Sequence, residues 1–336
     1  MNKIKFGIIG YGNIGKRHAQ HIIKHPEAIL TSICEVAGFE FEEELPPTIK
    51  RYDRIEDMLQ EGEIDVVNVC TPNYLHHPHT LMSLEAGKHV VCEKPMAISS
   101  EECEVMIQKA NQVNKTIFVV KQNRYNAPVQ QVRNLLMNQQ LGKVFMVQVN
   151  CFWNRNEYYY QESSWRGKKK LDGGCLFTQF SHFVDILFYL FGEISSCQGV
   201  MNNYNHPYTE VEDSGSFIMQ TKDGVMVNFN FSTCSYERNM EGAITILAEH
   251  GTIKIGGQYL NTIEYQHIKN VVLPAINIQA KSNDYGRYQG SMSNHDLVID
   301  NVVQTLRGKA EVMTNASEGK KVIDIIELMY MKNNNI

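Results

Sequence analysis

The chain has 336 residues, of which 43% are hydrophobic and 21% are charged, and its formal net charge is −5. This length predicts two domains, and the composition is typical of a folded protein rather than a disordered one. The mildly acidic charge argues against a nucleic-acid partner, which a protein meets with a basic face. A membrane partner is not expected either, because the longest apolar stretch, 183–191, is short and contains Asp185.

The eight cysteines indicate a reducing compartment. None forms a C-x-x-C pair, so the spacing predicts neither a zinc site nor a thioredoxin-like motif, and we expect no metal. Several lie inside apolar runs, where a free thiol behaves as a small hydrophobic group. The first strand pattern begins at Lys5, with no signal-peptide pattern before it. We therefore expect a cytoplasmic protein.

Short apolar runs alternate with helical periodicity through residues 1–121. Strands are expected at 5–9, 29–34, 65–70, 89–92 and 116–120, and helices at 13–25, 55–61, 78–86 and 99–113, the last capped by Ser99 or Ser100. Such alternation predicts an α/β fold, namely a Rossmann domain whose parallel sheet carries helices on both faces.

The pattern changes in residues 122–336. Strands are expected at 144–152, 194–201, 214–220, 225–233, 243–248 and 251–255, and helices at 128–140, 175–191, 294–306 and 317–331. This series predicts an α+β domain with an open, mostly antiparallel sheet, which would bind the substrate and form the oligomer. An open sheet needs its second face covered, so we expect a homodimer or homotetramer.

A glycine-rich turn follows the first strand. Gly10-Tyr11-Gly12-Asn13-Ile14-Gly15 is G-x-G-x-x-G in the strand–turn–helix context of dinucleotide-binding proteins, where the backbone of the turn holds the pyrophosphate. Glu35 ends the second strand, 20 residues after Gly15, and no arginine follows it. A carboxylate there accepts the ribose hydroxyls and repels a 2′-phosphate, so the pattern predicts NAD rather than NADP. The alternative is that Glu35 is an ordinary surface acid.

Two further segments resemble one family. They are Cys70-Thr71-Pro72-Asn73-Tyr74-Leu75-His76 with Glu93-Lys94-Pro95, and Gly173-Gly174 with His182 and Asp185. Together with the glycine turn they resemble the glucose–fructose oxidoreductase/inositol dehydrogenase (Gfo/Idh/MocA) family over essentially the whole chain. The resemblance implies oxidation of a sugar or cyclitol carbinol by a nicotinamide cofactor. It also implies that Cys70, Thr71, Pro72, Asn73, His76, Glu93 and Lys94 lie at the cofactor.

The same resemblance places Lys94 at the nicotinamide, against the reacting hydroxyl. An ammonium there stabilises developing alkoxide character while a base takes the proton. His182 is the second candidate for proton transfer. The alternatives are a solvated lysine and a core histidine. Family members usually carry Asp four residues before this histidine, where this chain has Thr178. Lys94 and His182, with Gln179, would then manage the proton without that acid.

Narrower features resemble the UDP-N-acetylglucosaminuronate 3-dehydrogenases of surface-polysaccharide pathways. They include residues 119–126, 154–160, 165–167, 178–182 and 241–246. This likeness implies cofactor contacts from Gln122, Asn123, Trp165 and Arg166, and substrate contacts from Lys94, Arg124, Arg155, Tyr159, Thr178, Gln179 and His182. Arginines suit the pyrophosphate and carboxylate of such a substrate, although residues 158–160 could instead be a tyrosine-rich subunit interface.

Two other functions stay open on the sequence. One is a dehydrogenase of inositol or another polyol from the same family. The other is a non-catalytic NAD-binding sensor, because a fold by itself does not fix a function.

Overall fold

The computed structural model describes residues 2–36, 45–274, 282–284 and 289–333, and the chain divides into two compact units. Unit 1 contains Met1–Lys121 and His295–Ile323, and unit 2 contains Gln122–Asn294 and Asp324–Ile336. The first crossing therefore follows Lys121, where the sequence pattern changes. The predicted second domain, 122–336, includes the segment His295–Ile323. In the structure this segment belongs to unit 1 instead.

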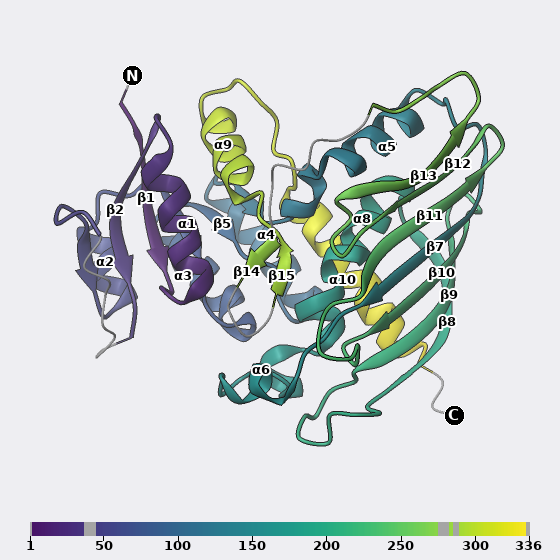
Figure 1. Cartoon of the computed structure of the whole chain (residues 1–336). Helices are drawn as coiled ribbons and strands as arrows, with labels where there is room; N and C mark the ends of the chain where they lie inside the picture. The colour runs from purple at the N-terminus through teal and green to yellow at the C-terminus, as the bar shows by residue number, and fades with distance from the viewer. Residues whose placement is uncertain (1, 37–44, 275–281, 285–288, 334–336) are drawn as a thin grey trace. The chain divides into compact units, whose positions relative to one another are not determined.

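Unit 1 is built on a six-stranded parallel sheet in the order β3-β2-β1-β4-β5-β6 (Figure 1). Its strands are β1 (Ile4–Ile9), β2 (Ala28–Cys34), β3 (Lys50–Tyr52), β4 (Val66–Val69), β5 (His89–Cys92) and β6 (Ile117–Val119). This order is that of doubly wound dinucleotide-binding domains, which confirms the predicted Rossmann architecture. All four residues of β4 are buried, as expected for a parallel strand covered on both faces.

The helices of unit 1 lie where the periodicity predicts them. They are α1 (Asn13–Lys24), α2 (Ile55–Glu61), α3 (His76–Glu85), α4 (Ser100–Gln112) and α9 (His295–Leu306), with a short 3₁₀ turn η1 (Asn73–Leu75). Ser99 caps α4, and its side chain accepts a hydrogen bond from the Glu102 amide at 3.2 Å. The returning helix α9 packs against α1.

Unit 2 is built on a seven-stranded sheet in the order β13-β12-β11-β7-β10-β9-β8. Its strands are β7 (Val144–Phe152), β8 (Ile194–Asn202), β9 (Ser214–Thr221), β10 (Met226–Ser232), β11 (Glu241–Ala248), β12 (Gly251–Gly256) and β13 (Thr262–Ile268). The β7–β10 pair is parallel and the other neighbours are antiparallel, which confirms an open, mostly antiparallel sheet. A separate small sheet pairs β14 (Ser282–Asp284) with β15 (Gln289–Met292).

One face of this sheet is covered by α8 (Ser181–Phe191). The Phe183 ring lies 5.4 Å from Trp153, and the Phe180 ring lies 5.2 Å from Phe231. The other helices of the unit are η2 (Gln122–Tyr125), α5 (Ala127–Met137), α6 (Glu157–Gln161) and α7 (Lys169–Asp172), and α10 (Ala316–Met331) begins in unit 1 and ends in unit 2. The predicted regular helix 175–191 is instead a π-helical segment, Leu176–Phe180, followed by α8.

The helical stretch Lys169–Phe191 is long and apolar enough, by length and composition alone, to cross a membrane. The prediction of no membrane partner rested on the shorter apolar run 183–191 within this stretch. In the structure, 89% of the apolar 18-residue part of this stretch is buried, as in the core helix of a globular unit.

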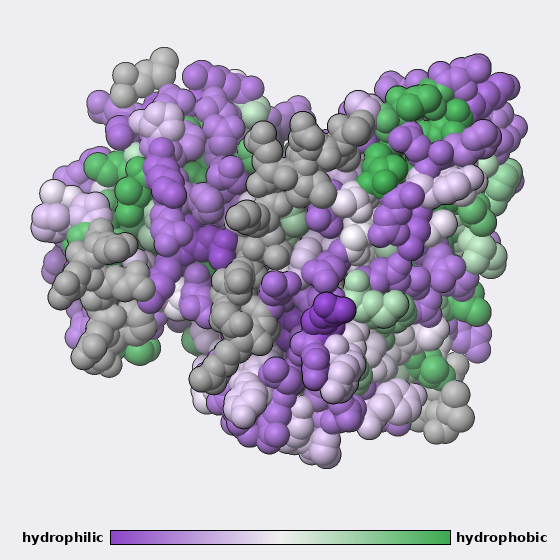
Figure 2. All heavy atoms as spheres, in the orientation of Figure 1, coloured by the Kyte–Doolittle hydropathy of each residue, from purple (hydrophilic) through white to green (hydrophobic). Residues whose placement is uncertain are grey.

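The opposite face of the sheet is open. Strand register places Ile218, Met226, Leu247 and Tyr265 on this one face, where they are 62%, 44%, 40% and 54% exposed. In Figure 2, apolar residues alternate with hydrophilic ones along the edge of unit 2 where the sheet lies. We call these four residues, with the polar side chains between them, the outer sheet face.

Candidate active site

The glycine turn between β1 and α1 uses each glycine for a different reason. Gly10 has φ +91°, a conformation that favours glycine, and a Cβ there would lie 2.8 Å from the Cys70 backbone. A Cβ on Gly15 would overlap the carbonyl oxygen of Gly10. Gly12 faces open space, with no atom within 4 Å of an added Cβ. It also begins α1 without a side-chain cap, so the first helical amides remain for an anionic group.

Glu35 lies against this turn. Its Oε2 accepts a hydrogen bond from the Tyr11 amide at 2.5 Å, and its Oε1 accepts one from the Val36 amide at 2.8 Å. The carboxylate is therefore fixed beside the glycine turn instead of extending into solvent as an ordinary surface acid. An open cradle at a helix N-terminus, with a fixed carboxylate beside it, fits a dinucleotide without a 2′-phosphate.

The turns that follow β4 and β5 are joined by His76. Its ring nitrogens contact the carbonyl oxygens of Thr71 at 2.8 Å and Pro95 at 2.6 Å. The imidazole is 1% exposed, and Cys70 and Asn73 are buried beside the same turn. These three predicted cofactor residues thus stabilise the shape of the turn, and Thr71 and Pro72 form its more exposed part.

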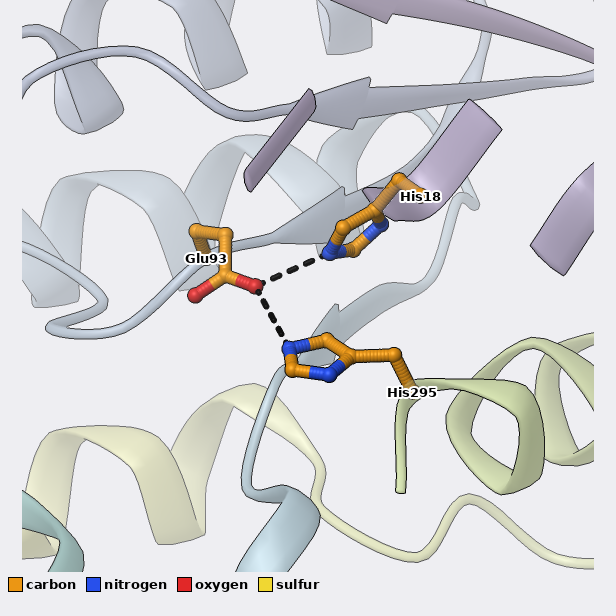
Figure 3. Close-up of side chains that lie close together, drawn as sticks. All are labelled: His18, Glu93 and His295. Carbon is orange, nitrogen blue, oxygen red and sulfur yellow. Dashed lines mark hydrogen bonds and ion pairs between the residues drawn. The ribbon is translucent and has the colours of Figure 1, made fainter. Parts of the chain in front are cut away.

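Glu93 is the centre of a buried cluster in unit 1 (Figure 3). Its Oε1 lies 2.9 Å from His18 Nε2 and 3.5 Å from His295 Nε2. Burial by itself raises the pKa of this carboxyl, but the hydrogen bonds with the two histidines outweigh burial and hold the pKa well below its usual value. Burial lowers the pKa of His295. The cluster therefore favours the ionised form of Glu93, while burial favours the neutral form of His295.

Lys94 follows this carboxylate at the carboxyl end of β5. Its backbone amide donates a hydrogen bond to Glu93 Oε2 at 3.0 Å, and its side chain is half-buried. Glu93 was predicted at the cofactor, whereas His18 and His295 were not among the predicted residues. The only signal for His18 was its place one helical turn after Gly15, on the buried face of α1.

His182 lies in the first turn of α8 in unit 2 and is 4% exposed. The π-helical segment directly before it carries Thr178 and Gln179. Single π-helical turns are rare and are frequent at functional sites, because the extra residue changes the direction of neighbouring side chains.

Thr178, which stands where an acid was expected, contacts a buried carboxylate from another part of the chain. The Thr178 hydroxyl donates a hydrogen bond to Asp172 Oδ1, and the Gly167 amide donates one to Asp172 Oδ2 at 2.7 Å. Burial raises the pKa of Asp172 to about 6, although these hydrogen bonds oppose the shift. Asp172 was not among the predicted residues, because it lies six positions before Thr178 and no helical spacing relates the two.

Three of the predicted substrate residues, Arg155, Tyr159 and Gln179, lie together in unit 2. Arg155 Nε donates to Gln179 Oε1 at 2.8 Å, and Gln179 Nε2 donates to the Tyr159 hydroxyl at 2.5 Å. The Arg155 and Arg166 guanidinium carbons lie 5.3 and 4.3 Å from the centre of the Tyr159 ring. Trp165 lies beside Arg166, at 5.7 Å. The structure thus concentrates positive charge and aromatic surface here, which suits an anionic ligand.

Arg124, which was predicted to contact the substrate, lies inside unit 2. It is fully buried and forms a forked ion pair with Asp185, with Nε–Oδ2 at 3.0 Å and Nη2–Oδ1 at 2.8 Å. A buried guanidinium whose charge is matched by a carboxylate is a structural group of unit 2. Gln122 and Asn123, predicted at the cofactor, are 2% and 1% exposed at the start of the same unit.

Comparisons with known proteins agree with this architecture. Residues 4–121 match the model of an oxidoreductase family with an NAD-binding Rossmann fold, and residues 129–254 match the GFO/IDH/MocA C-terminal domain. The structure is similar to that of the WlbA dehydrogenase from Bordetella pertussis in complex with NADH and UDP-GlcNAcA. The two are 32% identical over 98% of this chain and 96% of that chain, with a TM-score of 0.84.

Two other relatives cover the whole chain. The WlbA structure from Chromobacterium violaceum, also with NADH and UDP-GlcNAcA, is 31% identical over 99% of this chain and 94% of that chain, with a TM-score of 0.85. The glucose-6-phosphate 3-dehydrogenase of Bacillus subtilis is 25% identical over 98% of this chain and 97% of its own length. Unit 1 is therefore an NAD-binding domain.

The glycine turn yields a paired prediction. Gly12→Ala should leave the thermal unfolding midpoint almost unchanged, because φ −68° suits alanine and the added methyl meets open space. It should weaken NAD binding at least about tenfold, roughly 1.4 kcal/mol, because the methyl occupies the cradle. Gly15→Ala should instead destabilise the fold by about 1–3 kcal/mol through overpacking. Calorimetric NAD titration and thermal unfolding measure both, and equal effects of the two variants would contradict the assignment.

Asp172 yields a prediction on pH. A carboxyl whose pKa is raised from 3.8 to about 6 binds more protons in the folded state, so its contribution to stability declines as pH rises through that window. Asp172→Asn should therefore flatten the decline of unfolding free energy with pH in this range. Thr178→Val removes a hydrogen bond that lowers the pKa and should extend the decline to higher pH. Chemical denaturation across the range tests this, and parallel pH profiles for all three proteins would refute it.

Proposed function

The chain belongs to the Gfo/Idh/MocA family of NAD-dependent sugar and polyol dehydrogenases, and on that premise we propose that it oxidises C3 of UDP-N-acetylglucosaminuronate to a ketone. The observation that carries this proposal is the likeness, at 32% and 31% identity over almost the full length, to two WlbA dehydrogenases crystallised with NADH and UDP-GlcNAcA. Such a reaction belongs to surface-polysaccharide biosynthesis and would take place in the cytoplasm. The eight free cysteines support that compartment.

Lys94 and His182 would handle the proton of the reacting hydroxyl. When bound, the nicotinamide accepts the hydride from the carbinol carbon. Lys94 would place its ammonium against the hydroxyl oxygen and stabilise the negative charge that develops there. Glu93 supports this role, because it fixes the Lys94 backbone while both of its neighbouring histidines hold its own carboxylate. His182 would accept the proton, with Thr178 and Asp172 close by in sequence and joined by a hydrogen bond.

The substrate would bind through the charged and aromatic residues of unit 2. A nucleotide-sugar acid carries a pyrophosphate and a carboxylate, both of which arginine recognises through paired hydrogen bonds. Arg155 and Arg166 would supply that chemistry, since both guanidinium groups lie against the Tyr159 ring and Arg166 also donates to the Tyr159 carbonyl oxygen. Arg124 is not part of this proposal, because Asp185 already pairs with it.

Two alternatives remain testable. A dehydrogenase of inositol or another polyol would use the same Lys94 and His182 but would not need the two arginines. A non-catalytic sensor would bind NAD and oxidise none of these compounds. The first alternative is favoured by the varied substrates of relatives at lower identity, which include a scyllo-inositol 2-dehydrogenase of Bacillus subtilis.

The proposal predicts that NADH fluorescence rises when the protein and NAD meet UDP-N-acetylglucosaminuronate, and not with inositol or glucose 6-phosphate. Lys94→Met should reduce this rate by about 10²–10⁴-fold, with NAD affinity retained, because the group that stabilises the alkoxide is lost. Lys24→Met is the matched control, since Lys24 is an exposed lysine at the end of α1.

Other outcomes of this experiment would support a different function. Turnover of inositol alone would support the polyol dehydrogenase, and NAD binding without turnover of any of the three compounds would support the sensor. An undiminished rate in Lys94→Met would remove Lys94 from the chemistry.

The outer sheet face supports a homodimer or homotetramer. Four large apolar side chains on one open sheet are an expected contact surface for a second copy of this chain. Ile218→Glu should lower the sedimentation coefficient to that of a monomer, because it would bury a charge in the contact. Tyr236→Glu, at an 85% exposed tyrosine that lies on none of the sheet strands, should leave the coefficient unchanged. A wild-type protein that sediments as a monomer at micromolar concentration would rule out the oligomer.

A further inference from the structure

Three potential metal ligands that have no part in the proposed reaction converge in unit 2. His206 lies in the loop between β8 and β9, Asp213 lies directly before β9, and Cys234 lies just after β10. The His206 Nδ1 atom is 3.2 Å from Asp213 Oδ2 and 3.9 Å from Cys234 Sγ. All three donor atoms lie within 4.8 Å of one another.

The surrounding backbone fixes these ligands in place. Asp213 Oδ2 accepts hydrogen bonds from the amides of Tyr204 at 3.0 Å and Asn205 at 2.7 Å. The Asn203 carboxamide donates to the carbonyl oxygens of His206 at 2.8 Å and Val211 at 2.9 Å, which closes the loop. The donors are therefore held together before any ligand arrives, so little conformational entropy opposes binding.

The burial of the Asp213 carboxylate independently indicates that an ion binds here. Asp213 is fully buried, and among the described residues its Oδ1 has no hydrogen-bond partner. Buried carboxylate oxygens are nearly always partnered, and an ion is one common explanation for an exception. Cys234 is partly exposed, which gives an ion a route to the cluster, and Ser214 Oγ donates to its sulfur at 3.6 Å.

We propose that His206, Asp213 and Cys234 bind a divalent ion of the zinc class. Imidazole nitrogen, carboxylate oxygen and thiolate sulfur are the donors that Zn²⁺ uses in proteins. Ligands at the usual bond lengths around a tetrahedral ion lie about 3.3–3.7 Å apart, close to the separations of 3.2 and 3.9 Å seen here. Three protein ligands leave one position for water.

Charge and protons balance in this site. A divalent ion with one carboxylate, one thiolate and one neutral imidazole is neutral overall, which suits a buried location. Binding forms three coordination bonds and releases to solvent the thiol proton of Cys234 and any proton on His206 Nδ1. No electron is transferred.

The site would stabilise the loop between β8 and β9. It ties this loop to the end of β10, and the His206 ring packs 5.4 Å from Tyr160, the neighbour of Tyr159 on α6. The inference does not depend on the proposed substrate. It differs from the expectation of no metal, which considered only cysteine pairs close in sequence.

Cobalt titration of the chelator-treated full-length protein tests the site. Co²⁺ should bind one ion per chain with a thiolate-to-metal charge-transfer band, and Zn²⁺ should displace it. Cys234→Ser should abolish the band, and His206→Gln should weaken Co²⁺ binding at least about tenfold, because even outer partners of a metal ligand are worth that much. Cys197→Ser is the matched control, since Cys197 is another cysteine of unit 2 and lies on β8.

A second variant guards against misfolding. Cys234→His replaces the sulfur donor with a nitrogen donor, so it should still bind Zn²⁺ while the charge-transfer band disappears. Zn²⁺ should raise the unfolding midpoint of the wild type and of Cys197→Ser, and not that of Cys234→Ser. Absence of a band in the wild type, or an equal band in Cys234→Ser, would overturn the site.

Discussion

The buried carboxylate of Glu93 is the interaction on which unit 1 depends. An ionised group at 4% exposure is stable only where hydrogen bonds replace its water. Those partners come from three distant segments: His18 on α1, His295 on α9, and the Lys94 amide at the end of β5. The helix that begins at the glycine turn, the strand end that carries the lysine, and the returning segment are therefore held around one charge.

This arrangement explains why the C-terminal segment returns to unit 1. His295 is the first residue of that segment, and its imidazole lies 3.5 Å from Glu93 and beside His18 of α1. The His18 and His295 rings lie 5.4 Å apart. The geometry that fixes Lys94 thus depends on residues separated by most of the length of the chain.

In unit 2, the residue four positions before His182 differs from the one that the family resemblance leads us to expect. The acid expected four residues before His182 is replaced by Thr178, yet the Thr178 hydroxyl contacts the buried carboxylate of Asp172. A carboxylate therefore remains hydrogen-bonded to position 178, although it comes from the preceding short helix α7. Thr178 and Gln179 both lie in the π-helical segment. Gln179 forms hydrogen bonds with both Arg155 and Tyr159.

Local patterns in the sequence determined the order of strands and helices, the glycine turn and its neighbour Glu35, because period and short spacing are properties of contiguous residues. They did not predict β3, β13, the short helices α6 and α7 or the π-helical segment, where the local signal is weak or where packing overrides a regular one. Only the tertiary structure decided that Asp185 neutralises Arg124, that Asp172 supports Thr178, and that His206, Asp213 and Cys234 meet. Each of these contacts joins residues that are close in space. Their separation along the chain does not indicate which buried polar groups will pair.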